Sequence, residues 1–230
     1  MVAQLGLATA SHAINMMRVF TGIDPENREL AHGLCWSVSS MRDGVTCRSS
    51  PVMGHAPTVV SCCAAVAARQ DVIVRLLRDD QRMSEYDVYF DRLTPLAEID
   101  GARTTIRRIC CKPVWPTAPR DFVVCTTWTD VAEDGSVLLC TRSVPDDLFP
   151  CQKGYVRGQI MLSGYRIQPI GLLPRDDPLS DAAAGHDACK VTLMAHIDLG
   201  GTLPTSLMNQ LSTFAPLDTL LAIRKMAQNA

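Results

Sequence analysis

The chain of 230 residues is 47% apolar and 20% charged, with a formal net charge of −2. This composition excludes intrinsic disorder, because so apolar a chain with so little net charge can bury a core. Arg, Asp or Pro interrupts every apolar run before the roughly 20 residues that a membrane-spanning helix needs. The near-neutral charge balance also argues against a nucleic-acid partner. The length allows one large domain or two small ones, and we expect a soluble globular protein.

The first 20 residues are rich in apolar side chains and superficially similar to a signal peptide. However, His12 and Asn15 interrupt the stretch, and Arg18 stands where a cleavage region should lie. We therefore predict an amphipathic first helix, followed by a linker, over residues 1–31.

Ten cysteines occur in the chain, but no CxxC pair is among them. Cys62–Cys63 and Cys110–Cys111 are adjacent pairs, whose side chains point to opposite faces of a strand. This pattern favours small, buried, free thiols in a reducing cytosol, with no metal site.

Short extended segments and helices follow the linker. Three strands are predicted at 35–40, 45–49 and 58–67. The first two flank a hairpin turn at Met41-Arg42-Asp43-Gly44. The spacing of apolar residues then changes to that of a helix, predicted over 71–78, in which Ile73, Leu76 and Leu77 share one face. A second short helix is predicted over 81–87.

The middle of the chain is almost entirely strand. Six segments have the pattern of strands: 89–99, 102–112, 122–129, 136–144, 154–170 and 190–199. Asp100-Gly101 and Glu133-Asp134-Gly135 mark hairpin turns within this series. Arg120-Asp121 is predicted to form a turn-fixing ion pair at the start of a strand, and 171–188 a loop.

The chain ends in a long helix over 204–228. Pro204 suits its first turn, where the missing N–H would have no helical partner. Apolar residues recur every three or four positions at Leu207, Leu211, Phe214, Leu217 and Leu221. We expect this helix to pack against one antiparallel sheet, an α+β arrangement.

Several separated motifs, in the right order, resemble the START domain, the steroidogenic-acute-regulatory-protein-related lipid transfer domain. The resemblance begins at residues 112–122, where a Pro-rich turn leads into Pro119-Arg120-Asp121-Phe122. It covers roughly residues 33–228. The other matching motifs are Asp134-Gly135-Ser136, Arg142-Ser143-Val144, Gly154-Tyr155-Val156-Arg157, Leu162-Ser163-Gly164-Tyr165, Asp198-Leu199-Gly200-Gly201, and Asn209-Gln210.

The resemblance implies a helix-grip fold in a single domain over residues 1–230. In this fold a strongly curved antiparallel sheet of about nine strands wraps the C-terminal helix, and a tunnel between them holds one lipid. The family's ligands include phospholipids, sterols and sphingolipids. We accordingly expect a monomeric cytoplasmic carrier with no cofactor and with transient contact to membranes.

The family's cavity positions fall on one side of each strand. In this chain they correspond to Arg107, Ile109, Phe122, Val124, Thr126, Leu139, Thr141, Val191, Leu193, Ala195 and Ile197. The C-terminal helix adds Leu207, Leu211 and Phe214 to the expected lipid contacts. Asp87 lies where relatives have headgroup-contacting residues, so an Arg107–Asp87 pair could anchor a polar head. A shift of one residue would instead place Arg108 inside and Arg107 in solvent.

Two loops are candidates for a membrane gate. One presents Trp115 within residues 113–119, and the other contains Thr202, where ceramide-carrying relatives hold a second Trp. The alternative is that Trp115 packs between Pro113 and Pro116 and only stiffens the turn.

The sequence contains no phosphate-binding loop, nucleophile elbow or zinc spacing, so we predict no enzymatic activity. Two other functions remain open. The protein could be a lipid-responsive sensor or scaffold, or an enzyme of the wider helix-grip fold, which includes cyclases and hydrolases.

Overall fold

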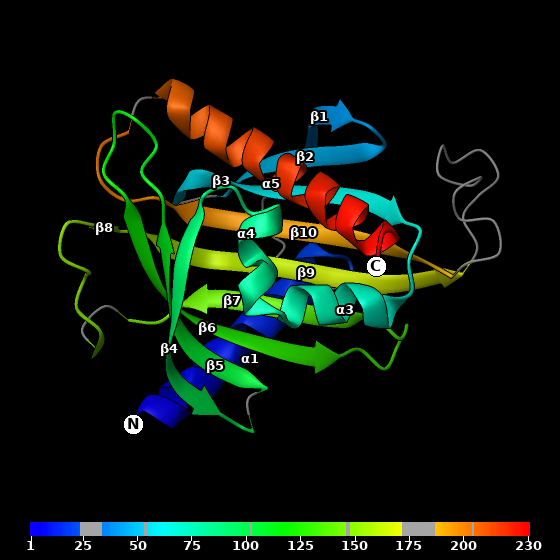
Figure 1. Ribbon diagram of the computed structural model, residues 1–230, viewed down its shortest axis with the longest axis horizontal. Helices are drawn as coiled ribbons and strands as arrows, with labels where there is room; N and C mark the ends of the chain where they lie inside the picture. Colours follow the sequence, from blue (N-terminus) through cyan, green and yellow to red (C-terminus); the bar gives the residue numbers. More distant parts are fainter. Residues whose placement is uncertain (24–33, 53–54, 102, 146–147, 172–186, 204) are drawn as a thin grey trace.

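A curved, open sheet organises the structure, shown as a computed structural model in Figure 1. The structure describes residues 1–23, 34–52, 55–101, 103–145, 148–171, 187–203 and 205–230. Pro204 and parts of the predicted 1–31 and 171–188 segments lie outside these ranges.

The sheet contains ten strands, in the order β1-β2-β3-β10-β9-β7-β6-β5-β4, with β8 paired to β6. Their bounds are β1 Ser37–Arg42, β2 Val45–Val52, β3 His55–Val66, β4 Phe90–Ile99, β5 Thr104–Cys111, β6 Arg120–Asp130, β7 Val137–Ser143, β8 Val156–Arg157, β9 Gln159–Gly171 and β10 Ala188–Asp198. Neighbours in the main order pair antiparallel, whereas β8 runs parallel to β6. The predicted sheet of about nine strands is confirmed. The single strand predicted at 154–170 is instead two strands, β8 and β9, which have different neighbours and are separated by Gly158.

The predicted hairpin turns are formed by residues that tolerate left-handed backbone. Arg42 pairs with Val45, so that Asp43 and Gly44 alone connect β1 to β2. Both have positive φ, 49° and 73°, as a type I′ turn requires. Asp100 and Gly101, between β4 and β5, also have positive φ.

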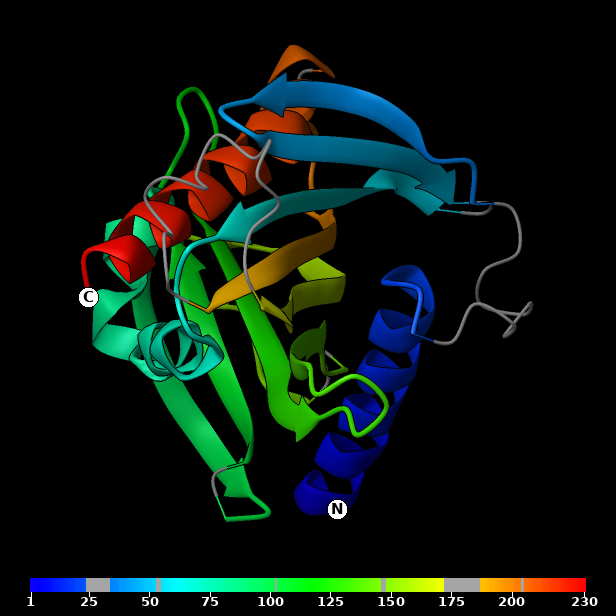
Figure 2. The same ribbon diagram turned by 90° about the vertical axis from the view of Figure 1, so that its right-hand side faces the viewer.

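Helices cover both faces of the sheet. Their bounds are α1 Val2–Phe20, α3 Gln70–Arg78, the 3₁₀ helix η1 Asp80–Arg82, α4 Met83–Tyr86 and α5 Thr205–Gln228. Figure 2 shows α1 on one face, with α3, α4 and α5 on the other. Among the described residues, no helix is both long and apolar enough to span a bilayer.

The two faces are held by separate apolar clusters. Ala13 and Met17 of α1 pack with Leu138, Leu162 and Met194 behind the sheet. On the other face, the predicted apolar side of α3 is buried with α5. This second cluster contains Ile73, Leu76, Leu77, Leu217, Leu220 and Ile223. The helices therefore bury apolar side chains on both faces of the sheet.

Leu211, Leu217 and Leu221 of the predicted apolar stripe of α5 face the interior. Leu217, Leu220 and Ile223 are buried as core residues, but Phe214 is 49% exposed. At about 100° per residue, Phe214 lies almost opposite Pro216 on the helix, and Pro216 faces inward. The prediction of Phe214 as a lipid contact is therefore not supported by its position.

The expectation that all cysteines are free thiols is wrong for one pair. Cys47 of β2 and Cys62 of β3 are directly opposite in the strand register and form a disulfide. Both side chains are fully buried in the cluster beneath α5. The pairing depends on the β2–β3 register, which a search for CxxC spacing does not reveal.

Candidate functional site

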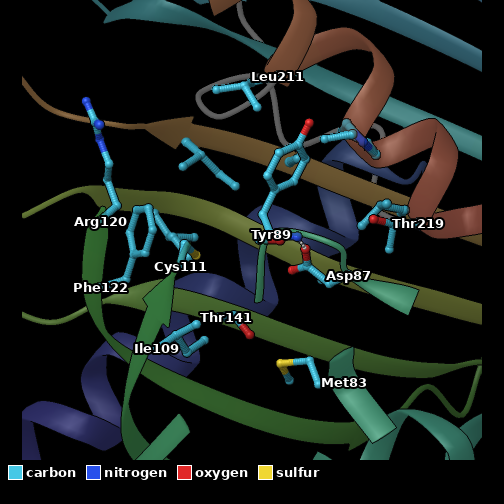
Figure 3. A pocket seen from close by; sticks show the side chains of 18 of the residues that line it. Met83, Asp87, Tyr89, Ile109, Cys111, Arg120, Phe122, Thr141, Leu211 and Thr219 are labelled. Atoms are coloured by element: carbon cyan, nitrogen blue, oxygen red, sulfur yellow. Dashed lines mark hydrogen bonds between the residues drawn. The ribbon is translucent and has the colours of Figure 1, made fainter. Parts of the chain in front are cut away.

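A cavity of about 420 Å³ lies between the sheet and the helices α3, α4 and α5. Its volume is within the range of roughly 300–1,000 Å³ that is usual for small-molecule sites. Most of its lining is apolar, and a limited set of polar side chains interrupts that lining. Figure 3 shows side chains from strands, α4 and α5 converging on this space.

The cavity brings together most of the predicted lipid-contacting positions. Its lining includes Asp87, Arg107, Ile109, Phe122, Thr126, Leu139, Thr141, Leu193, Ala195, Ile197 and Leu211. The positions implied by the resemblance to the START domain therefore line this space on β5, β6, β7 and β10, with the exceptions that follow.

Four predicted positions are not placed at the cavity. Val191 of β10 is fully buried in the cluster beneath α5. Val124 is fully buried, but it packs against Phe122 and Ile160, which themselves line the space. The resemblance to the family placed Val124 on this face without showing that neighbouring side chains pack against it. Phe214 is exposed on the outside of α5. The side chain of Leu207 lies outside the described part of the structure.

Arg107 faces the cavity but does not pair with Asp87 as predicted. Its Nη1 lies 2.7 Å from Oδ1 of Asp80, in η1. Its Nε and Nη2 donate to Oγ1 of Thr105, at 3.1 and 2.8 Å. The one-residue alternative is also excluded, because Arg108 lies near buried Asp121 and donates to Gln152 and the Pro150 carbonyl.

Asp87 is instead held by the backbone. Its Oδ1 accepts a hydrogen bond from the amide of Tyr89, at 3.0 Å (Figure 3). Burial raises the pKa of Asp87 above its ordinary value. The backbone hydrogen bonds from Tyr89 and Phe90 and the charge of Lys112 act in the opposite direction but are outweighed. Burial also raises the pKa of Tyr86 and of Tyr165. Both tyrosines therefore present neutral hydroxyl groups at neutral pH.

A second polar pair lies on the floor of the cavity. The hydroxyl oxygens of Thr126 and Thr141, on paired strands, are 3.2 Å apart. Trp128 lies further along β6, and the centre of its ring is 4.9 Å from the guanidinium carbon of Arg78 in α3. Trp128 was missed although it shares the strand face of Phe122 and Thr126, so alternation could have found it.

The two candidate gate loops meet at one end of the molecule (Figure 1). The β5–β6 loop, residues 112–119, presents Trp115 with 89% of its surface exposed. The β10–α5 loop, residues 199–203, contains Thr202, which is also exposed. Since the indole ring is almost fully exposed, it is not packed away between Pro113 and Pro116.

Arg120, the first residue of β6, joins these two loops. Its Nη1 donates to the Thr117 hydroxyl, at 2.7 Å, and to the Ala118 carbonyl. Its Nε and Nη2 donate to the carbonyls of Leu199 and Gly200, at 3.2 and 3.3 Å. The predicted Arg120–Asp121 pair is therefore wrong, since successive residues of a strand point to opposite faces.

Asp121 forms a different network behind the sheet. Its buried carboxylate accepts from Nε and Nη2 of Arg157, both at 3.0 Å, and from the Gln152 amide. Burial by itself acts to raise the pKa of Asp121, but these hydrogen bonds and that of Cys151 hold it below its ordinary value. The network ties β8 and the segment before it to β6.

Comparison with known sequences finds a match to the START domain over residues 30–219. Two human structures have a similar fold. StAR-related lipid transfer protein 5 superposes with a TM-score of 0.74 at 16% identity, covering 96% of this chain and 98% of that one. STARD10 superposes with a TM-score of 0.68 at 19% identity, covering 84% and 72%.

A curated relative comes from Pseudomonas aeruginosa. Uncharacterized protein PA1579 is 28% identical over 114 residues, which are 50% of this chain. The aligned segment spans about half of that relative, 48% of its length. This relative is itself uncharacterized, so the match adds no information about function.

Proposed function

We propose that this chain, which belongs to the START domain family, binds one lipid in the cavity and transfers it between membranes. The observation that carries the proposal is the cavity itself, about 420 Å³ with a mainly apolar lining and a few polar groups. A structural protein has no need for such a space, since interiors are otherwise close-packed.

The physical benefit of the cavity is protection of the lipid from water. A 16-carbon acyl chain costs on the order of 12 kcal/mol to expose, at about 0.8 kcal/mol per methylene. Apolar side chains such as Ile109, Leu139 and Leu193 would remove most of that cost during transit. Arg107, with Asp80, Thr126 and Thr141, would contact a polar group of the lipid or a water beneath it.

The exposed Trp115 supports a gate at the two loops. An indole at a loop tip is suited to the membrane interface, because it combines a large apolar ring with one N–H donor. We infer that this contact is weak and transient and that the protein acts as a carrier without turnover of its ligand.

The test is to identify what the purified protein carries. Native mass spectrometry and solvent extraction should find one lipid per chain, and labelled lipid should move between vesicles without chemical change. A conversion of the lipid would favour an enzyme instead. An empty protein that also fails to take up lipid from vesicles would contradict the proposal.

A further inference from the structure

The charge of the cavity wall is opposite in sign to that of the whole chain. Among the described residues, the lining contains the cationic side chains Arg78, Arg107, Lys112 and Arg120, but only two acidic ones, Asp80 and Asp87. The chain as a whole carries a net charge of −2. The wall therefore has an excess of positive charge, which an anionic ligand would neutralise.

Arg120 is the lining cation that most lacks an anion. Its residue surface is only 8% exposed, and burial lowers the pKa of its guanidinium. All four of its hydrogen bonds go to neutral oxygens, namely one hydroxyl and three backbone carbonyls. Within the described chain, no carboxylate lies at salt-bridge distance from it. A buried charge in such a setting is costly unless an anion joins it.

The other lining cations are already engaged. Arg107 is matched by Asp80, at 2.7 Å. Arg78 lies over the ring of Trp128. Lys112 interacts electrostatically with Asp87. Arg107 is also four strand positions from Arg120, about 13 Å along the sheet, so it suits a second, neutral polar group of the ligand.

We propose that Arg120 recognises an anionic group, carboxylate or phosphate, on the lipid that occupies the cavity. This inference rests on the proposed lipid-binding function. The planar guanidinium can bind two oxygens of either anion at once, and an anion supplies the opposite charge that its present hydroxyl and carbonyl partners lack. The anion would therefore replace the carbonyls of Leu199 and Gly200.

The same exchange would couple ligand binding to the gate. Arg120 now joins the β5–β6 loop to the β10–α5 loop, and the second loop leads directly into α5. Once an anion takes over the guanidinium, the β10–α5 loop loses two hydrogen bonds that hold it closed. Anionic ligands would thus loosen the connection that must open for their own entry and exit.

The test uses two pairs of lipids that differ in charge but not in chains. Neutral phosphatidylcholine vesicles carry either hexadecanoate or 1-hexadecanol, and either dioleoyl phosphatidic acid or dioleoylglycerol, each radiolabelled. Wild type, Arg120→Gln and Arg75→Gln are incubated with the vesicles, and bound lipid is counted after the vesicles are removed. Arg75 is the matched control, because its side chain is an exposed cation on α3, away from the cavity lining.

We expect wild type and Arg75→Gln to bind the anionic member of at least one pair about tenfold or more above its neutral partner. Arg120→Gln should bind the two members within about twofold. A preference within the first pair identifies carboxylate as the ligand group, and one within the second identifies phosphate. A preference that survives in Arg120→Gln, or is absent from wild type, overturns the proposal. Binding of none of the four lipids contradicts the lipid-binding function itself.

A direct measurement covers the case in which Arg120→Gln does not fold. The ¹⁵Nε resonance of Arg120 in the wild-type protein, assigned with Arg120→Lys, should shift on addition of the preferred anionic lipid and not with its neutral partner. Equal shifts with both lipids would show that Arg120 responds to gate movement alone, and would overturn its role in anion recognition.

Discussion

Arg107 and Asp80 form an ion pair at the cavity wall, with 2.7 Å between Nη1 and Oδ1, although 27 residues separate them. The pair connects β5 to η1, so it fixes the helical segment over the sheet. It also leaves Arg107 with a neutralised charge and a side chain that still faces the cavity. A hydroxyl, an ester or a water is therefore the group that Arg107 is expected to meet.

Replacement of Arg107 by Leu should weaken lipid binding several-fold, to about tenfold, while the protein still folds. The loss of binding follows from the loss of the donors that face the cavity. The fold should survive because Asp80 is partly exposed and remains hydrated without its partner. Lipid stoichiometry by native mass spectrometry measures the effect, with the exposed Arg92→Leu as a matched control. Unchanged stoichiometry and selectivity in Arg107→Leu would remove this residue from the site.

The buried carboxylate of Asp121 should be essential for stability. Replacement by Asn would leave Arg157 and Arg108 without their common anion, and loss of one partner of a buried ion pair typically costs about 3–5 kcal/mol. Urea unfolding at pH 7 measures this difference. Asp130→Asn, an exposed residue at the end of the same strand, is the control and should change the free energy of unfolding by less than about 0.5 kcal/mol.

The pH dependence of the same pair of proteins gives a second readout. Because the pKa of Asp121 is lowered in the folded protein, its contribution is complete above the ordinary carboxyl value of about 3.9 and is lost as pH falls through the lowered value. The difference between wild type and Asp121→Asn should therefore shrink below about pH 4. A constant difference at all pH values would show that the effect of Asn does not arise from charge.

Local sequence signals predicted the positions of the strands better than they predicted the contacts between residues far apart in the chain. The turns at Asp43-Gly44 and Asp100-Gly101 place the hairpins, because few residue types adopt their backbone conformation. The partner of Arg107, in contrast, could not be predicted from a local signal. Whether Asp80 or Asp87 meets it depends on how the short helices η1 and α4 lie over the sheet, and nothing in the local pattern specifies that.

The candidate site shows the same division. The resemblance to the START domain placed cavity positions on one face of four strands, yet it could not show that Val124 packs against Phe122 and Ile160 and does not line the space. Helical spacing predicted an apolar stripe on α5 that is correct for Leu211, Leu217 and Leu221, but packing left Phe214 outside. Arg120 was assigned to a local turn, because its bonds to residues 199 and 200 span about 80 positions of the chain.

The disulfide between Cys47 and Cys62 should be detectable and should stabilise the protein. Closure of a loop of 15 residues contributes about 3 kcal/mol, so Cys62→Ala should lower the free energy of unfolding by about 2–4 kcal/mol. Its neighbour Cys63 is a free thiol, and Cys63→Ala is the matched control, expected to cost about 1 kcal/mol or less.

Alkylation under denaturing conditions followed by mass spectrometry tests the bond itself. Without reductant, eight thiols should react, and with reductant all ten cysteines should. Ten reactive thiols in the absence of reductant would contradict the disulfide, and would return to the sequence-based expectation of a fully reduced chain.

The exposed Trp115 should control the rate of lipid transfer rather than the amount of lipid bound. Trp115→Ala should slow transfer between neutral vesicles by several-fold, because the loop tip loses the ring that enters the membrane interface. Occupancy at equilibrium should stay nearly constant, since the indole does not line the cavity. Stability should change by less than about 0.5 kcal/mol, because the ring is almost fully exposed.

Val88→Ala, at another exposed apolar residue, controls for a general loss of surface hydrophobicity. Transfer is followed by fluorescence of a labelled lipid at increasing vesicle concentration, and the defect should diminish as vesicles become more abundant. An unaltered transfer rate, or an equal defect in Val88→Ala, would remove Trp115 from the gate.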